Sequence, residues 1–365
     1  MLRTFRAPGR VNLIGDHVDY VGGMVCPASI DLECRVRVLT TEGDQLRVRS
    51  ADLDEEGVWD VHSIHKQEPT GTWMDYVVGI ARELDHRGIA LFPAHMEITS
   101  TVPIGAGLSS SASLEISIAL ALCDIAGEII PRPELVEICV AAERNFVGVQ
   151  CGIMDQFVSV YGAEGCALLL DCHTKKHQLI ELPSTMQVVV VDSMIRHSLG
   201  SSAYNERREQ CAKAEALIGK PLRELARTDI SGCIEVLPKP LKQRARHVVT
   251  ENERVRHFAE ACWHHDFKKM GVCMKESHES LRDNYEVSCQ ELDFLVDLAQ
   301  QQHATIGARM TGGGFGGCTV NLIEPGHLES WSATIKKVYA DQFSITPKVH
   351  VVTPSKGAGL CVQGA

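Results

Sequence analysis

The pattern of apolar and polar positions predicts a chain of mixed helices and strands. Short segments that are rich in β-branched residues and bounded by turn formers are typical of strands. Such segments occupy 34–40, 95–101, 166–171, 187–192 and 348–353. Apolar residues three or four positions apart predict amphipathic helices. These patterns cover 73–87, 111–125, 133–146, 204–218, 245–261 and 290–301.

Strands and helices interleave without strict alternation, which favours an α+β architecture over a doubly wound parallel sheet. Most of the glycine-rich turns lie in the first half, whereas charged amphipathic helices dominate after Asp192. A chain of 365 residues is long enough for about two domains. We therefore expect domains at 1–192 and 193–365, with an approximate boundary and with the last strands able to return to the first domain.

Composition narrows the class of protein. With 44% hydrophobic and 23% charged residues, the chain is typical of soluble globular proteins and unlike disordered, collagen-like or coiled-coil sequences. The net charge of -11 argues against nucleic acid or anionic membrane as a partner. Residues 1–10 contain no secretory signal, and the longest apolar run, 116–126, is too short to span a bilayer. The 14 cysteines form no CxxC pair, which predicts reduced thiols in a cytoplasmic protein.

The segment PIGAGLSSSAS at 103–113 follows an alternating strand and runs straight into an apolar-periodic helix. Its glycines allow a close approach to a ligand, and its three serines place hydroxyls and free N–H groups at a helix N-terminus, which attracts anions. This pattern predicts a phosphate cradle; the alternative is a glycine-rich turn with a serine N-cap. No Gly-Lys-Ser/Thr follows, so a Walker A loop is excluded.

A second glycine cluster, MTGGGFGGC at 310–318, formally contains GxGxxG. It leads into a predicted strand at 318–323, whereas a dinucleotide-binding fingerprint should lead into a helix. A loop whose backbone closes over a bound ligand fits this context better, and a purely structural turn is the alternative.

Two further segments concentrate acids. Residues 7–20, APGRVNLIGDHVDY, crowd an arginine, two acids and a histidine around glycine turns, a set suited to hydrogen-bonding several sugar hydroxyls. The alternative is a set of turn residues with a surface ion pair; a metal site would need ligands from other segments. In CGIMDQF at 151–157, Asp155 lies among apolar residues, where a carboxylate is either a buried capping group or a functional acid held by partners.

Other charged segments predict only surface structure. His264–His265 and Ser277–Glu279 lie in polar helical stretches without metal-ligand spacing, so we expect exposed histidines. The basic run 242–247 predicts a solvated helix face. Arg207 and Arg208 alternate with acids, which predicts i,i+4 ion pairs.

The four motifs together resemble the GHMP kinase superfamily and, within it, the galactokinase family. GRVNLIGDHVDY (9–20) and CGIMDQF (151–157) are similar to motifs specific to galactokinases. PIGAGLSSSASLE (103–115) and MTGGGFGGC (310–318) are similar to motifs shared across the superfamily. The resemblance extends from Arg6 to the end of the chain. It implies a two-domain α+β fold, with an N-terminal ribosomal-protein-like α/β domain and a C-terminal ferredoxin-like domain.

The resemblance also implies an activity, the ATP-dependent phosphorylation of the anomeric hydroxyl of galactose to galactose 1-phosphate. Asp155 would be the general base, and Arg10 would keep it ionised and stabilise developing negative charge. The implied sugar-binding positions are Asp16, His17, Val18, Asp19, Gly152 and Tyr204. The implied phosphate-binding positions are Gly105, Ala106, Gly107, Leu108, Ser109, Ser110 and Ser111.

The family further implies Mg²⁺ as cofactor, held by Ser111 and Glu143, since this hard ion prefers oxygen ligands. Trp73 resembles the position that contacts adenine, and a core position is its alternative. The glycines of 312–317 would line the floor of the site. The expected partners are galactose and ATP, with no nucleic acid and no membrane, in a monomer or weak homo-oligomer.

Two departures from the family pattern change the expectations. Galactokinases usually have Glu where this chain has Asp16, which should shift or weaken contact with one hydroxyl, the 6-hydroxyl in the family geometry. The sequence begins almost on its first motif, and we expect the missing helical extension to affect stability or the rim of the site more than chemistry.

Two alternatives to galactose phosphorylation stay open. One is a kinase for a related sugar such as N-acetylgalactosamine or arabinose, and the other is a non-catalytic sensor of galactose and ATP. The intact Arg10, Ser111, Ala112 and Asp155 disfavour the sensor. Homoserine and mevalonate kinases are rejected, because they lack GDHVDY and CGIMDQF.

Overall fold

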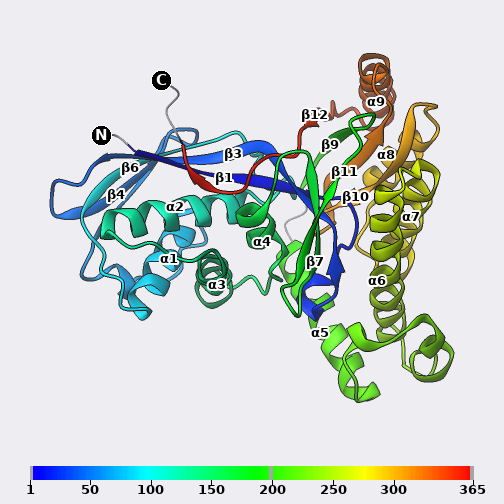
Figure 1. Cartoon of the computed structure of the whole chain (residues 1–365), viewed down its shortest axis with the longest axis horizontal. Helices are drawn as coiled ribbons and strands as arrows, with labels where there is room; N and C mark the ends of the chain where they lie inside the picture. Colours follow the sequence, from blue (N-terminus) through cyan, green and yellow to red (C-terminus); the bar gives the residue numbers. More distant parts are fainter. Residues whose placement is uncertain (1–2, 197–199, 362–365) are drawn as a thin grey trace.

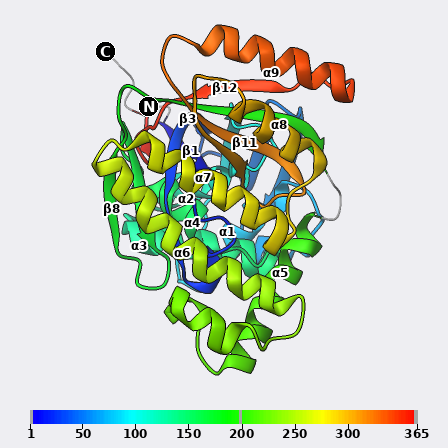
Figure 2. The same cartoon turned by 90° about the vertical axis from the view of Figure 1, so that its right-hand side faces the viewer.

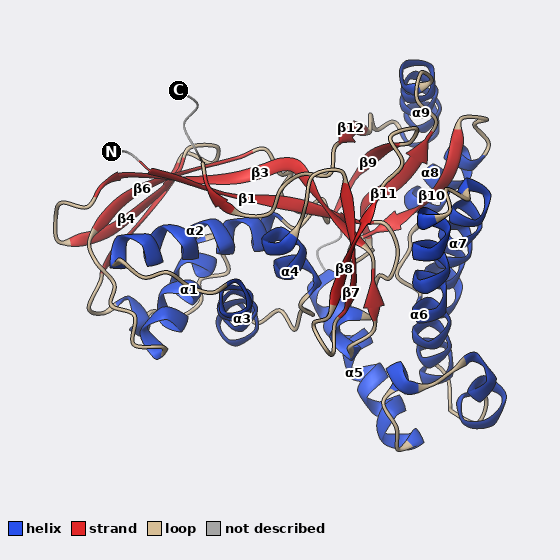
Figure 3. Ribbon diagram, viewed as in Figure 1, coloured by secondary structure: helices blue, strands red, loops and turns tan. Residues whose placement is uncertain are grey.

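The computed structural model describes residues 3–196 and 200–361, and the strands within them form three sheets (Figures 1 and 3). The largest sheet has the order β13-β1-β3-β6-β4-β5. Its strands are β1 (Arg3–Asn12), β3 (Pro27–Thr40), β4 (Gln45–Ser50), β5 (Glu55–Asp60), β6 (Ala94–Ser100) and β13 (Gly359–Leu360). Only the β4–β6 pair within it is parallel.

The two smaller sheets are antiparallel throughout. The four-stranded sheet has the order β10-β11-β9-β12, and the three-stranded sheet has the order β2-β7-β8. Their strands are β9 (Gln187–Arg196), β10 (Thr305–Thr311), β11 (Gly316–Ile323), β12 (Lys348–Val352), β2 (Met24–Val25), β7 (Cys166–Asp171) and β8 (His177–Glu181). The proposed domain boundary near residue 192 falls within β9.

Helices cover one face of the large sheet and flank the four-stranded sheet (Figures 1 and 2). The helices beneath the large sheet are α1 (Met74–His86), α2 (Ser110–Ala126), α3 (Arg132–Ala142) and α4 (Met154–Tyr161). The remaining helices are α5 (Gly200–Ile218), α6 (Leu241–Trp263), α7 (Phe267–Ser280), α8 (Gln290–Gln300) and α9 (Leu328–Phe343). In the described part of the chain, none of them combines the length and the apolar character that crossing a bilayer requires.

The apolar core joins the two ends of the molecule. One buried cluster lies between the large sheet and its helices. A second cluster places Val11, Leu13 and Ile14, which end β1 and follow it, against residues of β9, β11 and α6 such as Phe258. The loop after β1 is therefore fixed between the large sheet and the four-stranded sheet.

The N-terminal motif is more regular than the sequence predicts, because residues 7–12 belong to β1 rather than to a glycine-rich loop. The alternation that reveals a strand is missing, since this part of β1 is buried on both faces. A register shift lies between Pro8 and Arg10, a position where proline is tolerated. Glycine is required at residue 9, because a Cβ there would lie 2.7 Å from the backbone oxygen of Leu108.

Two predictions of exposed charge are wrong. His278 is 2% exposed, and its Nε2 lies 3.2 Å from Asp293 Oδ1, whereas His264 and His265 are exposed as predicted. In the run 242–247, Arg244 is 2% exposed and His247 is fully buried. Charged groups can be buried when partners compensate them, and the sequence does not show those partners.

Arg207 and Arg208 are also held by contacts other than the i,i+4 ion pairs that the sequence predicts within their own helix. Arg207 donates to the backbone oxygens of Tyr285 at 2.8 Å and Glu286 at 3.0 Å. Arg208 donates to the backbone oxygen of Gln150 at 2.9 Å. Both side chains therefore join α5 to loops that are distant in the sequence.

Candidate active site

A cavity of about 570 Å³ brings together residues of all four sequence motifs. The predicted site residues that line it are Arg10, Asp16, His17, Asp19, Trp73, Gly105, Gly107, Ser109, Ser110, Ser111, Glu143, Gly152, Asp155 and Tyr204, together with Gly312, Gly313 and Gly314. Val18, Ala106 and Leu108 do not line it: their side chains are fully buried in the apolar core. Those three can contribute backbone groups only.

Arg10 and Asp155 form a two-pronged ion pair although 145 residues separate them. Arg10 Nε lies 2.9 Å from Asp155 Oδ1, and Arg10 Nη2 lies 2.6 Å from Oδ2. The arginine side chain is 6% exposed and the aspartate side chain is 27% exposed, so the carboxylate faces the cavity with its counter-ion behind it. The carboxylate of Asp155 is therefore held by partners at the cavity, and it caps no helix by a side-chain bond.

The loop before α2 is bonded to this ion pair. Arg10 Nη1 donates to the backbone oxygen of Gly107 at 2.5 Å, and the backbone N–H of Arg10 donates to the oxygen of Leu108 at 3.0 Å. Ser109 occupies the N-cap position of α2, yet its hydroxyl makes no capping bond and instead donates to Asp155 Oδ2 at 2.5 Å. The first N–H groups of α2 consequently have no serine cap, and a helix N-terminus of this kind binds anions well.

His17 lines another part of the same cavity, and its ring lies among tyrosine rings. Its ring centroid is 5.3 Å from that of Tyr204 and 5.0 Å from that of Tyr285. Its Nε2 lies 3.2 Å from the backbone oxygen of Gly313, and its Nδ1 lies 3.1 Å from the hydroxyl of Tyr20. Burial lowers the pKa of His17 to about 3, so this imidazole is neutral at pH 7.

Asp19 lies close to Asp155 and shares the cavity with it. Burial, and then the charge of Asp155, raises the pKa of Asp19 to about 7. Gly152 lies directly against it, since a Cβ at this glycine would be 1.9 Å from Asp19 Oδ2. A side chain at residue 152 would therefore displace the carboxylate.

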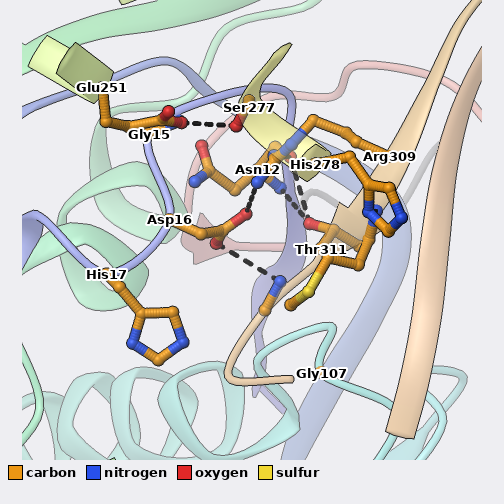
Figure 4. A network of polar contacts seen from close by, with 12 residues as sticks. Asn12, Gly15, Asp16, His17, Gly107, Glu251, Ser277, His278, Arg309 and Thr311 are labelled. Atoms are coloured by element: carbon orange, nitrogen blue, oxygen red, sulfur yellow. Dashed lines mark hydrogen bonds and ion pairs between the residues drawn. The ribbon is translucent and has the colours of Figure 1, made fainter. Parts of the chain in front are cut away.

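Asp16 lines the cavity and is held by β10 and the turn that follows it (Figure 4). Its Oδ2 pairs with Arg309 of β10, and its Oδ1 accepts from the backbone N–H of Gly312 at 3.3 Å. Burial raises the pKa of Asp16, and the charge of Arg309 opposes that rise. Arg309 is fully buried.

Glu143 follows α3, in a π-type turn, and lies beside Ser111. The Ser111 hydroxyl bonds to the Glu143 carboxylate. Gln156 Nε2 also donates to Glu143 Oε2 at 2.6 Å, and it reaches Glu115 Oε2 at 3.1 Å. Burial, followed by the charge of Asp155, raises the pKa of Glu143 to about 7.

The cavity has an apolar end at Trp73. The indole N–H donates to Glu55 Oε2 at 2.7 Å, while the ring packs partly against the core and also lines the cavity. Leu53, Tyr76 and Leu114 line the cavity as well. Trp73 is therefore packed partly against the core and open to the cavity, and its contact with adenine stays a prediction.

Comparison with known proteins matches the chain to three family models, described as "Galactokinase galactose-binding signature" (residues 3–38), "GHMP kinases N terminal domain" (75–163) and "GHMP kinases C terminal" (258–341). A galactokinase of Roseiflexus sp. (strain RS-1) is 40% identical over 99% of this chain and 93% of its own length. A galactokinase of Chloroflexus aurantiacus is 41% identical over all of this chain and 94% of its own.

The chain belongs to the galactokinase family.

Solved structures agree with this galactokinase assignment. The crystal structure of Lactococcus lactis galactokinase complexed with galactose has a TM-score of 0.93 and 32% identity, and the match covers 98% of this chain and 95% of that one. A mevalonate kinase structure has a TM-score of 0.70 at 18% identity over 97% of this chain and 99% of its own, which shows the fold alone. The two-domain GHMP kinase fold expected from the sequence is confirmed.

The sequence did not single out four residues of this galactokinase-family site: Glu115, Gln156, Arg196 and Arg309. Glu115 and Gln156 lie inside the motifs, and a polar residue in a strongly apolar helix was the available signal. Arg196 ends β9 beside the phosphate loop, where a Cβ on Gly105 would lie 3.4 Å from its Nε. Arg309 comes just before the glycine cluster, and nothing local shows that its partner is Asp16.

Proposed function

We propose that this protein is an ATP-dependent galactokinase that transfers the γ-phosphoryl group of ATP to the anomeric hydroxyl of galactose. The observation that carries the proposal is the Arg10–Asp155 pair, which is bonded to the glycine-serine loop through Gly107 and Ser109. A carboxylate that can accept a proton thus adjoins a loop suited to phosphate. The match to a galactokinase complexed with galactose supports the same reaction.

Asp155 would accept the proton of the anomeric hydroxyl as that oxygen attacks the phosphorus. Arg10 would stabilise the negative charge that develops there, because its guanidinium already lies against the carboxylate. Arg10 Nε, Arg10 Nη2 and Ser109 Oγ all donate to Asp155 and hold its carboxylate in a fixed position. Positioning and electrostatic stabilisation therefore contribute as much as proton transfer.

The phosphates of ATP would bind the loop 105–111 and the N-terminus of α2. Gly105 and Gly107 have positive φ angles of 68° and 77°, which directs backbone groups toward the cavity without side chains in the way. The hydroxyls of Ser109, Ser110 and Ser111 line the same cavity. Adenine would occupy the end near Trp73.

Mg²⁺ fits the residues present. Ser111 and Glu143 offer a hydroxyl and a carboxylate side by side, and a cation there would favour the ionised form of Glu143, whose pKa burial and the charge of Asp155 raise to about 7. No cluster of three or more His, Cys, Asp or Glu suited to a metal occurs among the described residues, so the ion would complete its shell with phosphate oxygens and water. When bound, Mg²⁺ neutralises charge on the β- and γ-phosphates.

Galactose would bind in the part of the cavity that is lined by Asp16, His17, Asp19, Gly152 and Tyr204. Carboxylates and a neutral imidazole can accept from hydroxyls, and the tyrosine ring offers a flat apolar wall. Val18 would act only through its backbone. A related sugar kinase and a non-catalytic sensor are the alternatives that the experiment below separates.

We further propose a cytoplasmic monomer or weak homo-oligomer that uses neither nucleic acid nor membrane. All 14 cysteines are free, as in proteins of reducing compartments. The net charge of -11 is unfavourable for polyanionic surfaces.

Asp155→Asn tests the proposal, because it preserves shape and removes the proton acceptor. General-base catalysis contributes about 10²- to 10⁴-fold, so kcat should fall at least about 100-fold while galactose still binds. ADP release coupled to an indicator reaction would be measured with galactose, N-acetylgalactosamine, arabinose, glucose and no sugar.

Asp283→Asn is the control, since this aspartate pairs with Arg282 outside the cavity. Its kcat should equal that of the unmodified protein. Near-normal turnover in Asp155→Asn would refute the role of Asp155. ADP release that no sugar stimulates would favour the sensor, and a preference for another sugar would correct the substrate.

A further inference from the structure

Arg309 links β10 to the end of β1 and to the loop that follows β1. It lies on β10, directly before the glycine cluster, and its side chain is fully buried. Its Nη2 pairs with Asp16 Oδ2, and its Nη1 donates to the backbone oxygen of Asn12 at 3.1 Å (Figure 4). This guanidinium is thus bonded to the last residue of β1 and to the loop that follows β1.

The carboxylate of Asp16 receives donors from the hairpin that begins with β10. Arg309 bonds to one oxygen, and the backbone N–H of Gly312 bonds to the other at 3.3 Å. The hairpin is itself tied to the end of β1, since Thr311 Oγ1 donates to the oxygen of Asn12 at 3.0 Å. The position of Asp16 in the cavity wall is therefore set by β10 rather than by the motif that contains it.

An ionised carboxylate that is 2% exposed needs a cation. Burial raises the pKa of Asp16 above its usual value, and the charge of Arg309 is the largest influence that opposes this rise. An ionised carboxylate can only accept hydrogen bonds, whereas a protonated one can also donate. A ligand group that meets Asp16 must consequently be a donor as long as Arg309 is present.

We propose that Arg309 is a specificity-determining positioning residue of the sugar subsite, which holds Asp16 as an acceptor-only carboxylate and so demands a hydroxyl donor from the sugar. This inference rests on the proposed function, since it takes Asp16 as a sugar contact. Arg309 thus gives Asp16 its charge and orientation, and this part of the cavity wall rejects a sugar that lacks the hydroxyl donor. A sugar with fluorine or hydrogen in place of that hydroxyl leaves the carboxylate unpaired.

The test compares galactose with its 2-, 3-, 4- and 6-deoxyfluoro analogues, which accept but cannot donate at the altered position. For the unmodified protein, one analogue should lose at least about 100-fold in kcat/KM relative to galactose, as expected for a site built around a buried hydrogen bond. In Arg309→Met the ratio between galactose and that analogue should fall at least tenfold, because Asp16 can then be protonated. The KM for ATP should stay within about twofold.

Two variants keep the test informative if Arg309→Met fails to fold. Arg309→Lys retains the charge and loses the forked geometry, so it should show an intermediate ratio. Asp16→Asn is isosteric and carries both donor and acceptor atoms, so it should lose the same discrimination as Arg309→Met. Sugar binding without nucleotide, followed by calorimetry, gives the ratio independently of turnover.

Arg244→Lys is the matched control. Arg244 is 2% exposed and paired with Glu286, but none of its partners is Asp16. Its variant should lose stability and keep the discrimination between galactose and the analogue. Equal losses for galactose, every analogue and ATP in the Arg309 variants, or an unchanged ratio, would overturn the inference. Absence of sugar-stimulated ADP release in the unmodified protein would instead overturn the proposed function.

Discussion

At the scale of single residues, the carboxylates of the site differ because of their neighbours. Asp155 accepts from Arg10 and Ser109, so its negative charge is balanced. Asp19 and Glu143 lie in the same cavity, and burial and the charge of Asp155 raise the pKa of each to about 7. The cavity thus contains one acid with a fixed counter-ion, Asp155, and two acids, Asp19 and Glu143, whose ionised forms would be stabilised by a positive charge or by hydroxyl donors.

Replacing Gly152 by alanine should weaken sugar binding selectively. The new Cβ would lie 1.9 Å from Asp19 Oδ2 and 2.2 Å from its Cγ, so the carboxylate must move away. Loss of a hydrogen bond to a charged group costs about 1.5–3 kcal/mol, which corresponds to a rise of about tenfold or more in the KM for galactose. Steady-state kinetics with galactose and ATP varied separately would measure it, and the KM for ATP should change little.

Gly232→Ala is the control for this substitution. No atom lies within 4 Å of a Cβ at Gly232, and its φ is not positive. Its kinetics should match those of the unmodified protein. An unchanged KM for galactose in Gly152→Ala would show that Asp19 does not contact the sugar.

Much of the cavity lining could be predicted from the sequence, because glycines, serines and acids in unusual local patterns reveal chemistry. The partners could not be predicted from local patterns. Whether Arg309 or His278 is buried depends on a counter-charge that lies elsewhere in the chain, and no local pattern shows it. The same limit applies to the serines at 109–111, since no local pattern shows that the hydroxyl of Ser109 bonds to Asp155 instead of capping α2.

At the scale of elements, the short helix α4 joins two functions. Asp155 bonds to β1 and to the loop before α2, whereas the next residue, Gln156, bonds to Glu143 and Glu115. Glu115 is fully buried in α2, and its Oε1 has no hydrogen-bond partner. A displacement of α4 would therefore disturb the acid and the candidate Mg²⁺ ligand together.

Gln156→Leu should weaken the use of Mg²⁺ as well as stability. Without the amide, Glu143 and Glu115 lose their shared donor, and Glu143 is free to turn away from Ser111. We expect the Mg²⁺ concentration for half-maximal activity to rise about tenfold, as for other residues that orient metal ligands. A titration with Mg²⁺ at fixed ATP and galactose, together with a thermal unfolding midpoint, would measure both effects.

Gln210→Leu separates the two effects. Gln210 is also buried, and it bonds to Glu206 and Arg244 outside the cavity. This variant should lose stability without a change in the Mg²⁺ requirement. If both glutamine variants shift the requirement equally, Gln156 does not orient Glu143.

Helices and strands with a clear period of apolar residues could be predicted from the sequence, and those without such a period could not. The predicted helix 111–125 corresponds to α2 at Ser110–Ala126, and the predicted strand 166–171 corresponds to β7. The strand β1 was hidden, because it contains Pro8 and Gly9 and has no exposed face over residues 7–12. The helix α3 ends at Ala142, earlier than predicted, where the chain widens into the π-type turn that carries Glu143.

At the scale of the whole molecule, the site depends on contacts between segments far apart in the chain. The loop after β1 lies between the large sheet and α6, and β13 returns from the C-terminal end to pair with β1. The net charge of -11 does not exclude a polyanionic nucleotide, because the groups around the cavity act locally. Serine hydroxyls of the loop 105–111 line the cavity, and the guanidinium groups of Arg10 and Arg196, each already paired with an aspartate, lie beside that loop.

The same junction contains a neutral, buried histidine. His247 of α6 donates from Nε2 to the backbone oxygen of Asp16 at 3.1 Å, and its Nδ1 accepts from Ser280 Oγ at 2.9 Å. A neutral ring satisfies both contacts, with Nε2 as the donor and Nδ1 as the acceptor. Burial lowers the pKa of His247 from 6.5 to about 4.

His247 should make the fold sensitive to mild acid. Above pH 6.5 the ring is neutral in both states, so the full stability is present. Between 6.5 and about 4 the unfolded chain binds a proton that the folded protein does not, and stability is lost as the pH falls. The loss is about 1.4 kcal/mol per pH unit, or about 3 kcal/mol over the window.

His247→Gln should therefore be less stable than the unmodified protein at pH 8 and should lose less stability between pH 7 and pH 5. Glutamine keeps a donor for the Asp16 oxygen and has no proton to gain in this range. Urea unfolding midpoints at each pH would measure the slopes, with exposed His264→Gln as a control that keeps the original slope. The slope that remains in His247→Gln should combine a loss from His17, whose pKa burial lowers to about 3, with an opposite contribution from Asp19 and Glu143, whose pKa values burial raises to about 7. An undiminished slope in that variant would show that the junction around Asp16 opens and admits the proton before the molecule unfolds.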